Sequence, residues 1–285
     1  MFHFGVDSYI WTERFLNKDL WIIPKAKELG FEVIDLAIGH PFEFPVQAVL
    51  EEKDRAGIQC VTTTTLGADT DLISPDPAIR QRGIEHMKKM VDINRILGSK
   101  ILAGVIYAGW GCLSGKPRTE QEWEWSVNAM REITQYAADN WDGILAVECV
   151  NRFETHFLNI AADGVQYCKD VGMPNIKVHL DCFHMIREEK SFAGAVKTCG
   201  KEYLGYVHVN ENDRGIPGTG LVPFEEFFRA LKEIGYDGPL TIESFDPSFE
   251  ETNRNCAIWR SFAPSGEALA VEGLADLKRI AAAIE

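Results

Sequence analysis

The chain has 285 residues, 46% of them hydrophobic and 25% charged, which is ordinary for a globular protein that buries a sizeable core. Its 29 basic and 43 acidic residues give a formal net charge of −14, and this charge repels phosphate backbones and anionic membrane surfaces. We therefore expect neither a nucleic-acid partner nor a membrane partner.

The seven cysteines are odd in number and scattered, and no CxxC pair occurs among them. This pattern predicts reduced, small core residues rather than disulfides or a zinc site. The N-terminal segment MFHFGVDSYIW lacks a basic stretch followed by a long apolar one, and no segment approaches the roughly 20 apolar residues that span a bilayer. We expect a cytoplasmic protein.

Short β-branched apolar segments alternate with longer segments of helical period along the whole chain. The eight predicted strands cover residues 4–9, 32–37, 57–65, 100–108, 143–149, 176–181, 204–210 and 240–244. Helical patterns separate them, a long segment from about Asn253 closes the series, and glycines end several helices just before the next strand, as in EEKDRAGIQC and KEIGYDGPLTI. Eight such units favour a single (β/α)8 TIM barrel over residues 1–285, an α/β fold, rather than an open doubly wound sheet.

Polar side chains recur at the ends of four consecutive predicted strands. Glu148 ends the fifth, Asp181 the sixth and Glu243 the eighth, and the seventh contains His208. The carboxyl ends of parallel barrel strands meet at the mouth where barrel enzymes place their chemistry. Taken singly, Glu148 and Glu243 could be solvated strand ends, Asp181 a helix cap and His208 a core histidine. Their recurrence favours a shared site.

Three carboxylates that converge at one mouth repel each other unless a positive charge lies among them. A divalent cation resolves this repulsion. Oxygen-rich ligation with one imidazole suits Mn²⁺, Mg²⁺ or Co²⁺ better than structural zinc, which prefers cysteine and histidine ligands. The residues therefore predict a metal centre formed by Glu148, Asp181, His208 and Glu243.

Four segments of the C-terminal half closely resemble the ketose 3-epimerases, the D-tagatose 3-epimerase and D-allulose (D-psicose) 3-epimerase group of xylose isomerase-like barrels. The segments are VECVNRFETHFLNIAADGVQYCKDVG, VHLDCFHMIREEKSFAGAV, GYVHVNENDRGIPGTG and GPLTIESF. The first half of the chain is compatible with this family but less diagnostic. The family usually carries a second histidine two residues before the metal histidine; here that position is Tyr206.

The resemblance implies a homo-oligomeric enzyme, a homodimer or homotetramer, that inverts C3 of a free ketose. The family's pattern implies that Mn²⁺ is held by the four strand-end residues, and that Glu154, His184 and Arg214 fix the O1 to O3 end of the sugar. Expected substrates are of the D-tagatose, D-fructose, D-allulose or L-ribulose type.

The expected chemistry agrees with these side chains. The C2 carbonyl acidifies the C3 hydrogen, and a cation near O2 and O3 stabilises the cis-enediolate that forms when the proton leaves. Inversion needs a base on one face and an acid on the other, and Glu148 and Glu243 can flank the sugar for these two roles.

The supporting residues each have a second interpretation. Arg214 offers a fork of donors to sugar oxygens or is a surface loop arginine, and His184 is expected just above a strand end as a ligand-contacting donor. Trp110, in the loop YAGWGCLSG, either covers the apolar face of a sugar or packs under a lid. Burial would make an unpaired Glu154 costly, so we expect a sugar hydroxyl or an arginine as its partner.

Other functions remain open at this stage. An aldose–ketose isomerase, similar to hydroxypyruvate or rhamnose isomerase, would use the same metal site, and the GIPGTG turn could bind a sugar phosphate. An endonuclease IV-type phosphodiesterase needs more metal-binding histidines and a basic groove, whereas this chain has only seven histidines in all and a net charge of −14. A non-catalytic sugar-binding relative would have lost one of the two glutamates.

Overall fold

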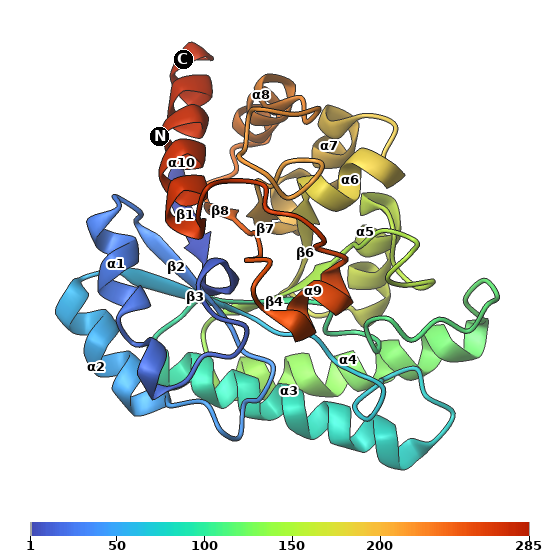
Figure 1. Ribbon diagram of the computed structural model, residues 1–285. Coiled ribbons are helices and arrows are strands. Elements are labelled where there is room, and N and C mark those ends of the chain that lie inside the picture. Colours follow the sequence, from blue (N-terminus) through green and yellow to red (C-terminus); the bar gives the residue numbers. More distant parts are fainter. Residues whose placement is uncertain (1, 285) are drawn as a thin grey trace.

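The predicted barrel is confirmed by a computed structural model that describes residues 2–284 (Figure 1). Eight parallel strands close in chain order, because β1 pairs with both β2 and β8. The strands are β1 (His3–Asp7), β2 (Val33–Ala37), β3 (Gln59–Thr63), β4 (Ile101–Gly104), β5 (Ile144–Glu148), β6 (Ile176–Asp181), β7 (Leu204–His208) and β8 (Pro239–Ile242). Most strands are shorter than predicted. At the mouth, the chain leaves the barrel one to four residues before the end of most predicted strands.

Most helices surround the barrel as an outer layer, and the short α9 lies in front of the strands (Figure 1). The helices are α1 (Ile22–Glu28), α2 (Val46–Ala56), α3 (Pro77–Leu97), α4 (Glu120–Asn140), α5 (Ala161–Val171), α6 (Cys182–Glu188), α7 (Phe192–Tyr203), α8 (Phe224–Ile234), α9 (Glu250–Cys256) and α10 (Gly266–Ala283), with 3-10 turns η1 (Ser8–Ile10) and η2 (Asn17–Asp19). Two features were not predicted. The short helix α6 directly follows β6, and the C-terminal segment divides into α9 and α10.

Local sequence signals explain where several helices begin and end. Thr119 and Glu122 form a capping box at the start of α4, in which each side chain accepts from the other's backbone N–H. Gly57 and Gly235 end α2 and α8 with positive φ angles of 62° and 71°. A side chain with a Cβ atom is strained in this left-handed region, so the predicted glycine stops are confirmed at these two positions.

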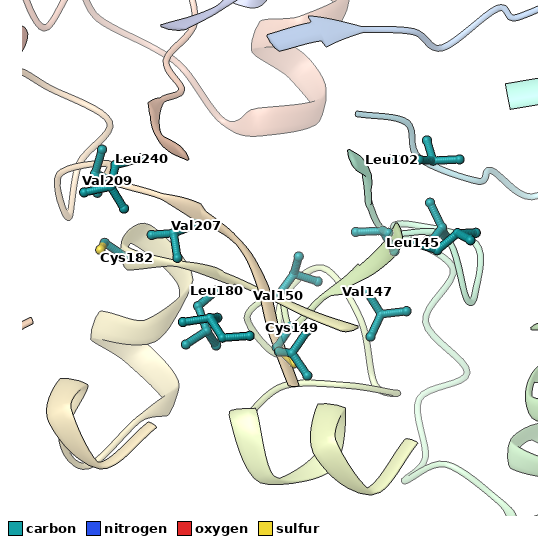
Figure 2. Packing of buried hydrophobic residues seen from close by; sticks show 14 of the residues in the cluster. Leu102, Leu145, Val147, Cys149, Val150, Leu180, Cys182, Val207, Val209 and Leu240 are labelled. Atoms are coloured by element: carbon teal, nitrogen blue, oxygen red, sulfur yellow. The ribbon is translucent and has the colours of Figure 1, made fainter. Parts of the chain in front are cut away.

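The core has two parts because strand side chains alternate between the two faces of the barrel. Outward-facing residues pack under the helices, and Figure 2 shows Leu145, Val147, Leu180 and Val207 in this layer. A smaller cluster fills the barrel interior with Val33, Val61, Ile101, Ala103, Ala146 and Tyr206. The inward positions nearest the mouth are polar, and they form the site described below.

The seven cysteines, all within the described residues, are free thiols. Five of them are buried, as expected, but Cys112 and Cys256 are only half-buried, so the prediction of core positions is wrong for these two. Within residues 2–284, the helices are all too short or too polar to span a bilayer.

Candidate active site

The alternation of strand side chains brings the four predicted metal ligands to one place. Glu148, Asp181 and His208 are the last residues of β5, β6 and β7, whereas β8 ends at Ile242 and Glu243 is the next residue. The residue before each of them packs outward against the helices. All four side chains therefore point into the barrel at its carboxyl end.

The ligand atoms of these residues form overlapping groups. Atoms of Asp181, His208 and Glu243 lie within 4.8 Å of one another, and His208 Nδ1 is 3.4 Å from both Asp181 Oδ2 and Glu243 Oε2. Glu148 forms a similar group with Asp181 and His184, and another with His179 and His208. Asp181 also caps α6 by accepting from Phe183 N at 2.6 Å. The helix-cap alternative is therefore correct, and the cap leaves Asp181 within the group described above.

The donors fit a divalent cation. His208 is 1% exposed, and its Nδ1 atom faces the two carboxylates without a hydrogen-bond partner. A buried nitrogen of this kind is costly to leave without a partner, and a metal bond would satisfy it. Three carboxylates and one imidazole, without a thiolate, are a donor set for a hard or borderline ion.

Arg214 is the positive group that lies among the acids. Its backbone is in the left-handed region at φ 66°, and its carbonyl oxygen accepts from Ser244 Oγ at 2.6 Å. Nη1 lies 3.0 Å from Asp181 Oδ2 and 2.5 Å from Glu243 Oε2. The guanidinium stacks near the Phe183 ring, 4.1 Å from its centroid. Arg214 is buried, so the surface-loop interpretation is wrong.

The two glutamates differ in their electrostatic surroundings. Burial raises the pKa of Glu148 well above its ordinary value, and the charges of Glu243 and Asp181 raise it further. Burial also acts to raise the pKa of Glu243, but Arg214 and His208 outweigh it, so that pKa is lowered. The same arginine helps hold the pKa of Asp181 well below its ordinary value against the effect of burial. The pKa values of the two carboxyls are thus shifted in opposite directions.

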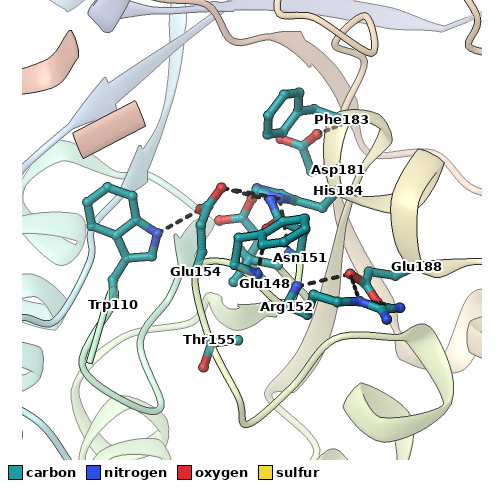
Figure 3. Close-up of polar contacts among 12 residues, drawn as sticks. Trp110, Glu148, Asn151, Arg152, Glu154, Thr155, Asp181, Phe183, His184 and Glu188 are labelled. Atoms are coloured by element: carbon teal, nitrogen blue, oxygen red, sulfur yellow. Dashed lines mark hydrogen bonds and ion pairs between the residues drawn. The ribbon is translucent and has the colours of Figure 1, made fainter. Parts of the chain in front are cut away.

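Glu154 has partners other than those predicted. Its Oε2 atom accepts from Trp110 Nε1 at 2.7 Å, and Oε1 accepts from Asn151 Nδ2 at 2.8 Å (Figure 3). The expected arginine partner is therefore wrong, although a sugar hydroxyl can still approach the carboxylate. Trp110 holds Glu154 in place through its indole N–H.

His184 lies in the first turn of α6, above the end of β6 as predicted. Its Nδ1 atom accepts from the backbone N–H of Asn151 at 3.2 Å, so the ring's hydrogen is on Nε2. Nε2 lies 3.6 Å from Glu148 Oε1. His184 therefore presents a donor to the same space as Glu148.

The site opens into a cavity of about 270 Å³. Among its lining residues are the six predicted for catalysis or sugar binding: Trp110, Glu148, Glu154, His184, Arg214 and Glu243. Thr252 and Cys256 of α9 also line it, and Figure 1 shows this helix in front of the strands. Asp181 and His208 lie beneath the cavity and are almost completely buried.

The GIPGTG turn is not a free phosphate cradle. The buried carboxylate of Glu211 accepts from the backbone N–H groups of Gly218, Leu221 and Val222 at 2.9 to 3.0 Å. A phosphate would need these same donors. The turn is instead closed by a side chain of the protein.

Sequence reasoning missed three buried polar residues of the site. Asn210 donates to Asp181 Oδ2 at 2.6 Å and accepts from the backbone N–H of Glu243 at 2.6 Å. Asn151 joins Glu154 to His184, and His179 lies below Glu148 at an inward position of β6. Every second residue of β6 and β7 points into the barrel, as Asp181 and His208 do. Counting two residues from each of these would have found His179 and Asn210.

Comparisons with known proteins agree with this geometry. A sequence model of the family described as Xylose isomerase-like TIM barrel matches residues 23–279. The L-ribulose 3-epimerase of a Methylomonas species is 36% identical over 262 residues, which are 90% of each chain. The ketose 3-epimerase of Arthrobacter globiformis is 33% identical and covers 96% of this chain and 95% of its own.

A crystal structure of D-allulose 3-epimerase from a Methylomonas species, in complex with D-allulose, superimposes with a TM-score of 0.93. The two chains are 33% identical, and the match covers 98% of this chain and 96% of the other. The protein therefore belongs to the ketose 3-epimerase family of xylose isomerase-like TIM barrels. The sequence-based assignments to this family and to the epimerases of the isomerase class are confirmed.

Proposed function

We propose that this enzyme inverts C3 of a free ketose and that the substrate is of the D-tagatose, D-fructose, D-allulose or L-ribulose type. One observation supports this most directly: Glu148 and Glu243 line the same sugar-sized cavity above the buried residues Asp181 and His208. The relatives named L-ribulose, ketose and D-allulose 3-epimerase support the choice of reaction.

Glu148, Asp181, His208 and Glu243 would hold the cation, with Mn²⁺ as the proposed ion and Mg²⁺ or Co²⁺ as alternatives. When bound, a divalent cation supplies positive charge that acidifies the C3 hydrogen and stabilises the enediolate. The unpartnered Nδ1 atom of His208 supports this assignment.

Glu148 and Glu243 exchange protons with the sugar. In one direction, the ionised Glu243 takes the C3 proton. The electron pair of the C–H bond forms the C2=C3 double bond, and the π pair of the C2 carbonyl moves to its oxygen to give the enediolate. The protonated Glu148 then gives its proton to the opposite face of C3, and the C2 carbonyl forms again. The reverse reaction exchanges the two roles. This division is supported by the position of the two carboxyls, which follow different strands, β5 and β8, and line the same cavity.

Arg214, His184 and Glu154 orient the sugar. Arg214 and His184 offer N–H donors to the cavity, and Glu154 offers an acceptor that Trp110 and Asn151 hold in place. Orientation of this kind lowers the barrier because the reacting carbon must lie within reach of both glutamates.

A free sugar is favoured over a phosphorylated one. Glu211 accepts from the N–H group of Gly218 in the GIPGTG turn and from those of Leu221 and Val222 directly after it, and the net charge of −14 repels anionic substrates. We therefore assign no phosphate subsite to this turn.

We also propose that the enzyme works as a homodimer or homotetramer in the cytoplasm, as the family resemblance implies. Light scattering during gel filtration measures the oligomeric state. A monomeric peak that retains full activity would contradict the proposed assembly.

The function is tested by incubating the protein and Mn²⁺ with a panel of free ketohexoses, free ketopentoses and their phosphates. We expect chromatography to show the C3 epimer of at least one free ketose and no turnover of its phosphate. An aldose product would instead favour the isomerase alternative, because that reaction moves the carbonyl without inverting C3.

Preferred turnover of a ketose phosphate would contradict the assignment to free sugars. Glu148→Gln provides the control for contaminating activities, because glutamine has nearly the shape of glutamate but lacks the group that we place in proton transfer. Product formation that this variant leaves unchanged would remove Glu148 from the reaction.

A further inference from the structure

The two nitrogens of His208 face different surroundings. Nδ1 faces Asp181 and Glu243 on the side of the metal ligands, and it has no hydrogen-bond partner. Nε2 faces the opposite side and lies 3.2 Å from Oδ2 of Asp35, a completely buried residue of β2. A carboxylate only accepts hydrogen bonds. The contact therefore requires a hydrogen on Nε2. In the neutral imidazole, the form that binds a metal, this leaves the lone pair of Nδ1 directed at the metal ligands.

Side chains from two other strands hold the Asp35 carboxylate in this position. Thr63 of β3 donates its hydroxyl to Oδ1 at 3.0 Å. Tyr206 of β7 donates its hydroxyl to Oδ2 at 2.6 Å, and that hydroxyl is also 2.7 Å from Thr241 Oγ1 of β8. The carboxylate thus accepts from three donors and is completely removed from water, so its orientation is determined by the barrel.

Tyr206 occupies the position at which the family resemblance leads us to expect a second histidine. Its hydroxyl crosses the barrel interior to a residue 171 positions away in the chain. This tyrosine therefore does not replace a metal ligand. It fixes the carboxylate that in turn contacts His208.

We propose that Asp35 is a positioning residue for the metal centre: it holds His208 with the hydrogen on Nε2 and the lone pair of Nδ1 toward the cation, and Tyr206 holds Asp35. This inference rests on the metal site of the proposed function. Carboxylates behind metal-binding histidines commonly fix the ring's tautomer and orientation, and their loss weakens metal binding by about 10- to 100-fold.

The chain contains a matched control for this role. Asp7 of β1 is also completely buried and is paired directly with Asp35 in the barrel register. Its Oδ1 atom accepts from the backbone N–H of Tyr9, and it forms no hydrogen bond with His208 among the described residues. Asp7→Asn thus removes a buried carboxyl at the same level of the barrel without removing the contact with His208.

The experiment measures Mn²⁺ binding by calorimetry in the absence of sugar. Asp35→Asn leaves one amide oxygen for three donors. We therefore expect the dissociation constant for Mn²⁺ to rise by about 10- to 100-fold in this variant. Tyr206→Phe removes one hydrogen bond to Asp35 and should give a smaller rise. Asp7→Asn should change the Mn²⁺ dissociation constant by less than about 3-fold. Circular dichroism confirms that each variant is folded, and Tyr206→Phe carries the test if Asp35→Asn does not fold.

Nitrogen NMR of histidine-labelled, Mg²⁺-loaded protein gives a second measurement. We expect His208 to carry its hydrogen on Nε2, with a metal-shifted Nδ1 signal that weakens in Asp35→Asn. A hydrogen on Nδ1, equal effects of Asp35→Asn and Asp7→Asn, or unchanged Mn²⁺ affinity in Asp35→Asn would overturn the proposal while leaving the proposed function intact. Wild-type protein that binds no divalent cation would instead remove the metal site itself.

Discussion

The Nη1 atom of Arg214 lies 3.0 Å from Oδ2 of Asp181, so the chain supplies part of the positive charge that the clustered acids require. The same nitrogen contacts Glu243. A divalent cation is therefore not the only group that offsets the repulsion among the acids. Catalysis can therefore require the metal even if folding does not.

Removal of metal should abolish activity without unfolding the protein. We expect dialysis against EDTA to eliminate turnover, and Mn²⁺ or Co²⁺ to restore it, while the far-UV circular dichroism spectrum stays unchanged. Asp181→Asn should weaken metal binding far more than it lowers the melting temperature. Full turnover by metal-free protein would contradict the assignment of all four ligands.

Arg214→Ala should raise KM and lower kcat together, because a misplaced sugar loses both binding and the geometry for proton transfer. We expect kcat/KM to fall by about 10²-fold or more. Arg214→Lys should recover only part of the loss, since a lysine keeps the charge but not the planar fork of donors. Steady-state kinetics with a free ketose measures both constants.

The matched control is Arg260→Ala, which removes an exposed arginine paired with Asp213 at 3.2 Å. It should leave both constants unchanged. If Arg214→Ala behaved like this control, the role of Arg214 in sugar binding would be wrong.

The two-glutamate mechanism predicts that solvent deuterium appears at C3 of the product when the reaction runs in D₂O. The incoming proton comes from the acid that did not take the outgoing one. Glu148→Gln and Glu243→Gln should each lower kcat by at least about 10²- to 10⁴-fold, the usual cost of losing a general acid or base. Mass spectrometry and NMR of the product locate the label.

The two variants also differ in a partial reaction. With metal retained, one of them should exchange the C3 hydrogen of a given epimer without inverting it, while the other should not. Product that keeps its original hydrogen at C3, or carries label only at C1, would rule out this mechanism.

Glu211→Gln should destabilise the loop that carries Arg214. The carboxylate accepts from the backbone N–H groups of Gly218, Leu221 and Val222, whereas glutamine offers a single acceptor oxygen and directs an NH₂ group at the remaining donors. We expect the free energy of unfolding to fall by about 1–3 kcal/mol and kcat to fall with it. Urea unfolding and kinetics measure the two effects.

Glu225→Gln, at an exposed position of α8, should change the free energy of unfolding by less than about 0.5 kcal/mol. If Glu211→Gln were equally neutral, the carboxylate would not be what closes the turn. New turnover of a ketose phosphate by Glu211→Gln would indicate that the freed N–H groups bind phosphate.

His86 should make stability depend on pH. Burial lowers its pKa to about 4 from the model-compound value of 6.5. Thr64 donates its hydroxyl to the Ile38 carbonyl oxygen at 2.7 Å, so His86 Nε2, 3.0 Å from that hydroxyl, carries a hydrogen. Between the two pKa values the unfolded chain binds more protons than the folded one, so stability falls as pH falls from about 6.5 to 4.

His86→Gln removes this contribution. The free energy of unfolding falls between pH 7 and pH 5 in the wild type. In the His86→Gln variant we expect this fall to be smaller by about 2 kcal/mol. His3→Gln, a change at an exposed histidine, is the control. Urea titrations at the two pH values measure the difference, and identical pH dependences of wild type and His86→Gln would refute the prediction.

The sequence by itself determined the barrel and the four strand-end residues. Both depend on local patterns: the alternation of side chains along a strand repeats every two residues, and the end of an apolar segment marks where a strand reaches the mouth. Glu148 and Asp181 could be placed because their neighbours Val147 and Leu180 mark the outward face.

Only the tertiary structure decided which groups meet across the barrel. Asp35 contacts His208 over 173 positions of the chain, and Trp110, rather than an arginine, bonds to Glu154 over 44. No spacing in the sequence encodes such pairs, because they arise from the closure and register of eight strands and from the paths of the loops. The left-handed backbone conformation of Arg214 is also decided only by the tertiary structure. The surrounding contacts hold a conformation that an arginine disfavours.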